Sequence, residues 1–174
     1  RSEHEVINLR RSDTHKLGLA LHIGFLRLSG RTLNAIRVVP ASLWIHLGKE
    51  LGVPPPEVAS LKAMYSRGRT FFDHQQLAQE TLGFGWPTDH QRRSFVHALR
   101  DEAIRFSDKD QLLNFARRWL YDRHFLIEHD RALRSQIVAA LNLLEAETGA
   151  TIATTVPCAL LDKWHDSLAQ FRPD

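Results

Sequence analysis

The sequence predicts an all-α protein, a bundle of several helices with helix-turn-helix elements, and three observations support this class. Apolar residues recur at the three- and four-residue spacing of a helix face through most of the chain. Gly, Pro, Asp, Ser and Thr residues separate these segments, as is typical of helix ends. No stretch alternates apolar and polar residues for long, so we expect no sheet.

The first half of the chain contains four expected helices. Asp13 is a good N-cap for a strongly apolar helix that Gly30 ends, and this helix should be buried at the centre of the fold. Pro40 fits the first turn of the next helix. The break Arg67-Gly68-Arg69-Thr70 separates the last two. In chain order the four helices cover residues 13–30, 40–52, 57–66 and 71–82.

The loop Gly83-Phe84-Gly85-Trp86-Pro87 divides the chain near its middle. We therefore expect two helical lobes, residues 1–86 and 87–174, with the second packed on the first as one region. In the second lobe three helices begin near residues 89, 108 and 130, and Gly149 should end the third. Residues 149–174 should be a linker, or a short extended piece, followed by a terminal helix that opens at Pro157.

Composition excludes several classes of protein. The 174 residues are 43% hydrophobic and 25% charged, and no apolar run is long enough to span a membrane or to form a signal peptide. The single cysteine, Cys158, cannot form an internal disulfide or a cysteine-based zinc site, so we expect a reducing, cytoplasmic setting. The net charge is +3, but the basic excess is concentrated in the first 40 residues, which carry seven basic and three acidic side chains.

No motif predicts catalysis, a cofactor or a metal ion. The ten histidines include no His-Glu-x-x-His pair, and there is no phosphate-binding glycine loop and no Gly-x-Ser-x-Gly. His124 and His129, with carboxylates around them, leave a weak divalent-metal site open, although a solvated turn explains them as well. His22 and His46 lie among apolar residues and are expected to be hydrogen-bonded core histidines.

Basic clusters at helix starts and on polar helix faces are the better functional signal. Arginine offers a planar fork of donors for phosphates and guanine edges, and free backbone N–H groups at a helix start suit a phosphate. Solvated helix faces with salt bridges are the alternative explanation for each cluster. The candidate DNA contacts are Arg67, Arg69, Thr70, His74, Gln75, Arg92, Arg93, Asn114, Arg117 and Arg118.

A set of motifs in a fixed order gives these clusters a context. Leu17-Gly18-Leu19-Ala20-Leu21 is followed by Leu26-Arg27-x2-Gly30-Arg31, Leu51-Gly52-Val53, Tyr65-x-Arg67-x2-Thr70-x3-His74 and Leu82-Gly83-Phe84. Over about residues 10–106 this order and spacing resemble the opening region of the Tn-three family, the replicative, cointegrate-forming bacterial transposases. One departure is Phe71, which stands where the family often has Arg.

The resemblance implies that this region recognises the terminal inverted repeats of a transposon during DNA transposition. It also implies that the acidic triad and Mg²⁺ of the reaction belong to a separate carboxyl-terminal domain. The expected partners are double-stranded DNA and the rest of the transposase, with a homodimer left open. The rival hypotheses are a helical interaction module, for dimerisation or autoinhibition of the transposase, and a small helical enzyme.

Overall fold

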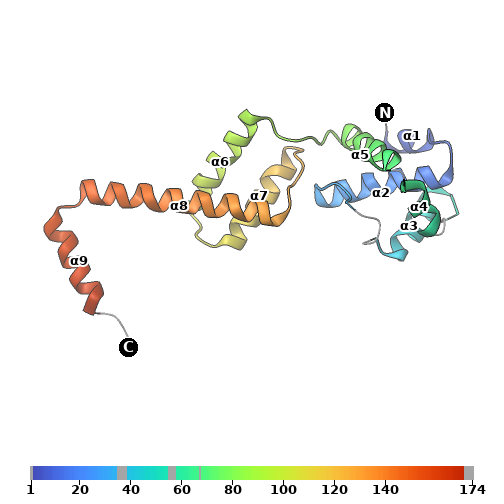
Figure 1. The fold of residues 1–174 in the computed structure, drawn as a ribbon. Helices are drawn as coiled ribbons and strands as arrows, with labels where there is room; N and C mark the ends of the chain where they lie inside the picture. The colour runs from blue at the N-terminus through green and yellow to red at the C-terminus, as the bar shows by residue number, and fades with distance from the viewer. Residues whose placement is uncertain (1, 35–38, 55–57, 67, 171–174) are drawn as a thin grey trace. The chain divides into compact units, whose positions relative to one another are not determined.

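The computed structural model describes residues 2–34, 39–54, 58–66 and 68–170. Every regular element among them is a helix, which confirms the all-α prediction (Figure 1). Outside the helices, the described residues also form an isolated parallel β-bridge between Gly85 and Phe125. The helices are α1 (Glu3–Asn8), α2 (Asp13–Ser29), α3 (Ala41–Leu51), α4 (Val58–Tyr65), α5 (Arg69–Leu82), α6 (Asp89–Ala103), α7 (Lys109–Asp122), α8 (Asp130–Thr155) and α9 (Cys158–Gln170).

Local sequence signals account for most helix ends. The Ser12 side chain caps α2, one residue before the expected Asp13. Gly30 ends the helix in the left-handed conformation with φ of 66°, as its sequence position indicates. Helix α5 begins at Arg69, two residues earlier than expected, because Gly68 takes a positive φ of 70° and allows the chain to turn directly into the helix.

The chain forms two compact units. Unit 1 comprises Arg1–Arg92 and Arg117–His129, and unit 2 comprises Arg93–Ala116 and Asp130–Asp174. Helix α7 therefore contributes its first half to unit 2 and its second half to unit 1.

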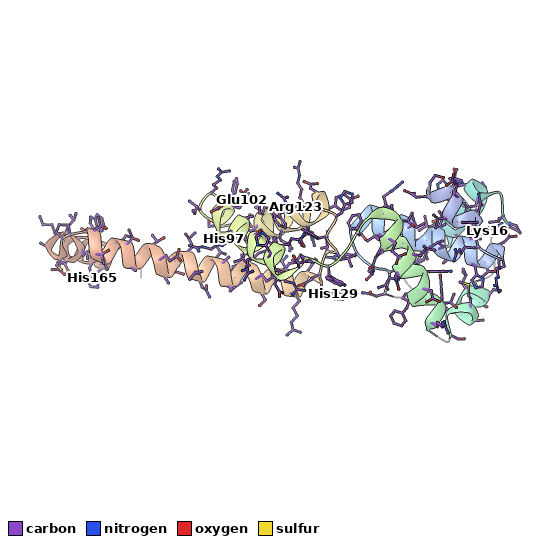
Figure 2. The ribbon with its side chains drawn as sticks, turned by 90° about the horizontal axis from the view of Figure 1, so that it is seen from above. Lys16, His97, Glu102, Arg123, His129 and His165 are labelled. Carbon is purple, nitrogen blue, oxygen red and sulfur yellow. The ribbon has the colours of Figure 1, made fainter. Side chains whose placement is uncertain are left out.

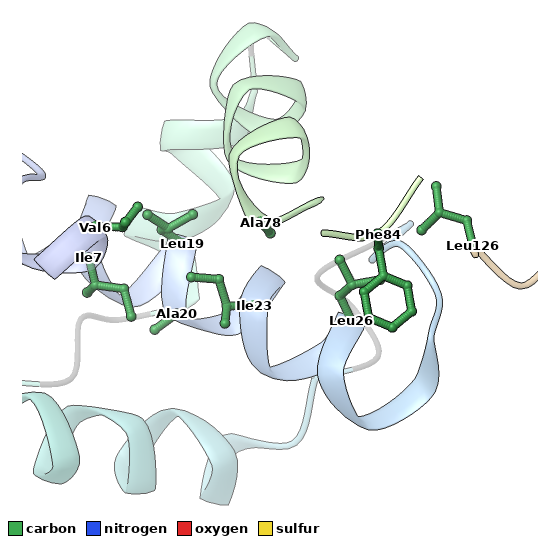
Figure 3. Packing of buried hydrophobic residues seen from close by; sticks show 9 residues of the cluster. All are labelled: Val6, Ile7, Leu19, Ala20, Ile23, Leu26, Ala78, Phe84 and Leu126. Atoms are coloured by element: carbon green, nitrogen blue, oxygen red, sulfur yellow. The ribbon is translucent and has the colours of Figure 1, made fainter. Parts of the chain in front are cut away.

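Helix α2 is the centre of unit 1, as its continuous apolar sequence predicts. Leu19, Ala20, Ile23 and Leu26 of α2 pack in one buried cluster with residues of α1 and α5 and with Phe84 and Leu126 (Figure 3). Leu17 and Leu21, on another side of the helix, belong to a second cluster with Trp44, Leu61 and Tyr65. Because α2 is buried on several sides, it fixes the positions of α3, α4 and α5 around it.

Unit 2 has a smaller buried core, made by α6, the first half of α7 and the first turns of α8. Its largest fully buried side chains are Leu99, Leu112, Leu133 and Ile137. Helix α8 continues through Gly149 to Thr155, so the predicted helix end and linker at this point are wrong. A glycine inside a helix costs only about 1 kcal/mol relative to alanine. Gly149 does not take the positive φ that ends α2 at Gly30, so the helix continues through it.

No helix in the described part of the chain is both long enough and apolar enough to cross a membrane.

Candidate nucleic-acid interface

The two units differ in charge. By sequence, unit 1 carries fifteen Lys and Arg against ten Asp and Glu, a net charge of +5. Unit 2 carries eight against ten, a net charge of −2. The second half of α7 and the loop after it add Arg117, Arg118 and Arg123 to unit 1. A basic excess confined to one compact unit attracts a polyanion to that unit.

Helices α4 and α5 form a tight pair joined by a short turn. On α5, Arg69, Phe72 and Gln76 recur at helical spacing on the exposed face, and His74 and Ala78 lie on the buried face. The Arg69 side chain is 90% exposed and lies 4.0 Å from Asp73, a distance at which an exposed ion pair holds it only weakly. Gln76 donates a hydrogen bond of 2.8 Å to Glu80 on the same helix.

A buried cluster of rings fixes α5 against α2 and α4. The Tyr65 hydroxyl and the His74 Nδ1 share a hydrogen bond of 2.8 Å. The His22 ring lies edge-on to the rings of Tyr65, Phe71 and His74, with centroid distances of 5.8, 4.8 and 6.1 Å. Phe71 therefore packs into the unit, while Phe72 beside it is 66% exposed.

Burial keeps the two core histidines neutral. Desolvation, with a smaller contribution from His74, lowers the pKa of His22 to about 3. Desolvation is also the main cause that lowers the pKa of His74 to about 4, and His15 and Arg10 lower it further. Burial raises the pKa of Tyr65 above its ordinary value, so the hydroxyl keeps its proton. The cluster is thus an uncharged polar core at neutral pH.

Three histidine predictions are settled by this packing. His22 is buried as expected, but its Nε2 has no hydrogen-bond partner among the described residues, so it is not the satisfied histidine that we predicted. His46 is exposed on α3, and its prediction as a core histidine is wrong. His74 was a candidate DNA contact, and this is corrected: its side chain is only 3% exposed and its Nδ1 is occupied by Tyr65.

A polar groove of about 560 Å³ lies beside the amino-terminal ends of α2 and α5. Its lining includes the hydroxyls of Ser12, Thr14, Ser66 and Thr70 and the ring of His15. Ser12 is engaged in capping α2 and in a hydrogen bond of 2.9 Å with His15 Nδ1. The Ser66 hydroxyl donates a hydrogen bond of 2.7 Å to the Ala63 carbonyl. Hydroxyl and backbone N–H groups at a helix start are donors that proteins use for phosphate oxygens, and Thr70 stands at such a position.

The structure brings Arg69, Thr70 and Gln75 together on the first turns of α5, where the first is exposed and the other two are half-buried. Arg67 lies outside the described residues.

The remaining candidates lie on α6 and α7. Arg92 and Arg93 are exposed in the first turns of α6, and the Arg92 Nε donates a hydrogen bond of 3.2 Å to the Pro87 carbonyl. On α7, Asn114 is exposed and Arg117 is half-buried, while Arg118 is exposed and lies 3.6 Å from Asp122. Arg93 and Asn114 belong to unit 2, and the other three belong to unit 1.

Sequence reasoning missed two exposed features of unit 1. Phe72 is an exposed aromatic ring on the outer face of α5, and only the three-residue spacing from Arg69 could have indicated it. The Arg123 guanidinium lies 4.1 Å from the centre of the Trp119 ring, an arrangement that fixes an arginine in place without neutralising it. Its signal was the four-residue spacing of Trp119, on α7, and Arg123, directly after that helix.

Among the described residues, no three His, Cys, Asp or Glu side chains gather as they would around a metal ion. The open hypothesis of a site at His124 and His129 gains no support, and His124 takes a positive φ of 56° in the turn after α7.

Residues 1–140 match the family model described as a domain of unknown function, DUF4158. The chain belongs to the DUF4158 family. It is 60% identical, over 173 residues and 99% of its length, to the transposase for insertion sequence element IS1071 in transposon Tn5271 from Comamonas testosteroni. It is also 28% identical, over 110 residues and 63% of its length, to the transposase for transposon Tn1546 from Enterococcus faecium.

These matches confirm the relationship of this DUF4158 chain to the opening region of Tn-three family transposases. The chain spans about 18% of the length of the Comamonas transposase and 11% of the Enterococcus transposase.

Proposed function

We propose that unit 1 binds duplex DNA and recognises the terminal inverted repeats of a transposon, as one part of a longer transposase. The observation that carries this proposal is the division of charge, with the whole basic excess in the unit that presents α5. Basic side chains neutralise phosphates and supply the sequence-independent part of DNA affinity. The relatives are transposases by name, and a transposase has to find the ends of its element.

Helix α5 is the best candidate for reading bases, with α4 and α5 acting as a helix-turn-helix. Arg69 at its start can neutralise a phosphate, and Gln75 and Gln76 can pair with adenine edges in the major groove. The exposed ring of Phe72 can contact a thymine methyl group. The ring cluster behind the helix holds this face rigid, which lowers the entropic cost of binding.

The groove beside α2 and α5 supplies an anchor for the DNA backbone in this scheme. Ser66 and Thr70 line it next to the first turn of α5, so a phosphate bound there would fix the register of α5 on the duplex. Arg92, Arg117 and Arg118 are proposed as further phosphate contacts, as are Arg93 and Asn114 from unit 2.

Catalysis is assigned to the part of the transposase outside this chain. The chain spans a small fraction of its relatives, and its described residues gather no carboxylate or histidine set. Two-metal phosphoryl transfer needs such a set.

The test is a mobility-shift titration of transposon-end DNA with the double variant Arg67→Ala and Arg69→Ala. We expect binding to weaken about ten-fold, while circular dichroism shows an unchanged helical content. The matched control removes two arginines from unit 2, Arg131→Ala with Arg134→Ala, and should leave the affinity within about two-fold of that of the parent chain.

Unchanged affinity in the unit 1 variant, or an equal loss in the control, would contradict the assignment of α5. Binding by the parent chain should also weaken steeply as salt is raised, because each neutralised phosphate releases counterions.

A further inference from the structure

The turn that follows α7 brings three distant segments of unit 1 together. The Gly85 N–H, in the loop after α5, donates a hydrogen bond of 3.0 Å to the His124 carbonyl. The Ile127 N–H donates one of 2.8 Å to the Gly30 carbonyl at the end of α2. Backbone hydrogen bonds therefore hold the turn on two sides, and Arg123, which is labelled in Figure 2, lies at its start.

Two contacts hold Arg123 in place and leave its positive charge intact. Its guanidinium lies 4.1 Å from the centre of the Trp119 ring, and its Nη1 donates a hydrogen bond of 3.3 Å to the Trp119 carbonyl. Asp122, the neighbouring carboxylate in the sequence, lies 3.6 Å from Arg118. Arg123 is thus an exposed cation that is already oriented, so it loses less side-chain entropy when it binds an anion.

Arg92 belongs to the segment that Gly85 joins to this turn. Its Nε donates a hydrogen bond of 3.2 Å to the carbonyl of Pro87, two residues beyond Gly85. Arg92 and Arg123 are therefore both exposed and both fixed by main-chain carbonyl groups. These contacts suit the binding of a polyanion, because neither is an ion pair that has to break first.

His124, the next residue of the turn, has a backbone conformation that glycine usually provides. Its φ is 56°, and the other described residues with a positive φ are all glycines. A side chain is strained in this conformation, so the presence of one indicates a use for it. The imidazole ring lies 5.1 Å from the ring of Phe84, and the residue remains exposed beside Arg123.

We propose that Arg123 and His124 together bind a phosphate of the DNA backbone, at the opposite end of α5 from Arg69. Guanidinium and imidazole N–H groups are both donors for phosphate oxygens. The 14 residues of α5 span about 21 Å. Contacts at its two ends would fix both the register and the angle of the helix on the duplex, which a single contact cannot do. The proposal deepens the DNA-binding role of unit 1 and rests on it.

The test measures the affinity of the 174-residue chain for a transposon-end duplex at several salt concentrations, by fluorescence anisotropy. We expect Arg123→Ala to weaken binding about three- to ten-fold and to lower the slope of log K against log salt by about one, because one phosphate contact is lost. The matched control is Lys49→Ala, which removes an exposed charge from α3 in the same unit. It should change the affinity by less than about two-fold and leave the slope unchanged.

Arg123→Gln separates charge from packing. Glutamine retains part of the aliphatic stem over Trp119 and an amide donor for its carbonyl, so the turn should keep its structure. We expect the same loss of affinity as with Arg123→Ala. A loss confined to the alanine variant would assign Arg123 to packing against Trp119 and would overturn the proposal.

His124→Gly separates binding from stability. Glycine relieves the strain at a φ of 56°, so the thermal midpoint should stay the same or rise. Binding should nevertheless weaken about two- to five-fold, because the imidazole donor is gone. A lower midpoint with unchanged affinity would make His124 a purely structural residue and would contradict its assignment.

Phosphate-ethylation interference locates the contact on the duplex. The phosphates at which interference disappears in Arg123→Ala should differ from those at which it disappears in Arg69→Ala. If the parent chain does not bind the duplex, the DNA-binding role of unit 1 fails together with this proposal. If the parent chain binds and Arg123→Ala loses no more affinity than Lys49→Ala, this proposal alone is overturned.

Discussion

Unit 1 and unit 2 are both helical, but they differ in what their helices bury. In unit 1, α2 is surrounded, and a cluster of histidine and tyrosine rings lies between it and α5. In unit 2, α8 extends about four turns beyond its last buried residue, Ala140, before α9 begins. Unit 1 is basic and unit 2 is acidic.

The two units therefore present different kinds of helix surface. A helix that reads DNA needs a rigid support, because a mobile helix loses entropy when it binds. For the proposed role of α5, the packed rings behind it supply that support, and Arg67 and Arg69 stand at its start in the sequence. In unit 2, by contrast, α9 leaves Trp164 and Leu168 exposed.

The largest expected effect is that of low pH, which should lower the free energy of unfolding of unit 1 more than that of unit 2. The pKa values of His22 and His74 are lowered from 6.5 to about 3 and about 4, so the unfolded chain takes up these protons first. Their contribution to the stability of unit 1 is therefore complete above pH 6.5 and is lost as the pH falls toward 4 and 3. Each histidine contributes a slope of about 1.4 kcal/mol per pH unit in that window.

Hydrogen exchange followed separately in α2 and α8 between pH 7 and pH 4 measures this difference. We expect the free energy of opening to fall in α2, and His22→Leu to reduce the slope because one titrating group is removed. A slope for α2 that this substitution leaves unchanged would show that His22 does not titrate as described.

The next largest effect is expected from Gly18→Ala in α2. A Cβ at this position would lie 2.4 Å from the Tyr65 hydroxyl oxygen and 2.8 Å from the Met64 Cε, so the ring cluster has to shift. We expect a loss of about 1–3 kcal/mol in the free energy of unfolding of unit 1.

Gly24→Ala on the same helix is the matched control for that variant. A Cβ there meets nothing within 4 Å, so the higher helix propensity of alanine should stabilise α2 by about 0.5–1 kcal/mol. Chemical denaturation of both variants gives the two values, and a loss of the same size at the two glycines would refute the close contact with Tyr65.

A smaller effect is expected from Tyr65→Phe, which removes the hydrogen bond to His74 and retains the ring. We expect a loss of about 1–2 kcal/mol, because a buried nitrogen is left without its partner. Tyr121→Phe, at an exposed tyrosine that donates to the Arg27 carbonyl, should cost about 0.5 kcal/mol or less by the same denaturation measurement. Equal losses would mean that the buried bond contributes no more to stability than the exposed one.

The smallest effect is expected in unit 2 from Arg134→Ala, which breaks an exposed ion pair of 2.7 Å with Asp110. Solvent screens such a pair, so its removal should cost about 0.5 kcal/mol or less. A double-mutant cycle with Asp110→Ala isolates the interaction. A coupling energy above about 1 kcal/mol would mean that this surface is more rigid than its exposure indicates.

The helical class and the central position of α2 could be predicted because they follow from local apolar spacing and from helix-ending glycines such as Gly30. The continuation of α8 could not, because Gly149 is only slightly unfavourable in a helix and no residue near it forces a stop. The burial of His74 could not be predicted from the sequence either, because it depends on contacts with Tyr65, nine residues earlier, and with α2. The excess charge of unit 1 comes mainly from the basic first 40 residues, which the sequence shows directly, whereas the contribution of Arg117, Arg118 and Arg123 depends on the return of α7, which no local pattern encodes.

The central claim, that unit 1 binds DNA, is tested most directly by fluorescence anisotropy of a labelled transposon-end duplex with two triple variants. One carries Arg69→Ala, Arg92→Ala and Arg118→Ala in unit 1, and the other carries Arg105→Ala, Arg131→Ala and Arg134→Ala in unit 2. Both remove three positive charges. We predict that the first weakens binding by about 30-fold or more and lowers the salt dependence, while the second changes affinity by less than about three-fold. Equal losses in the two variants, or no binding by the parent chain, would contradict the claim.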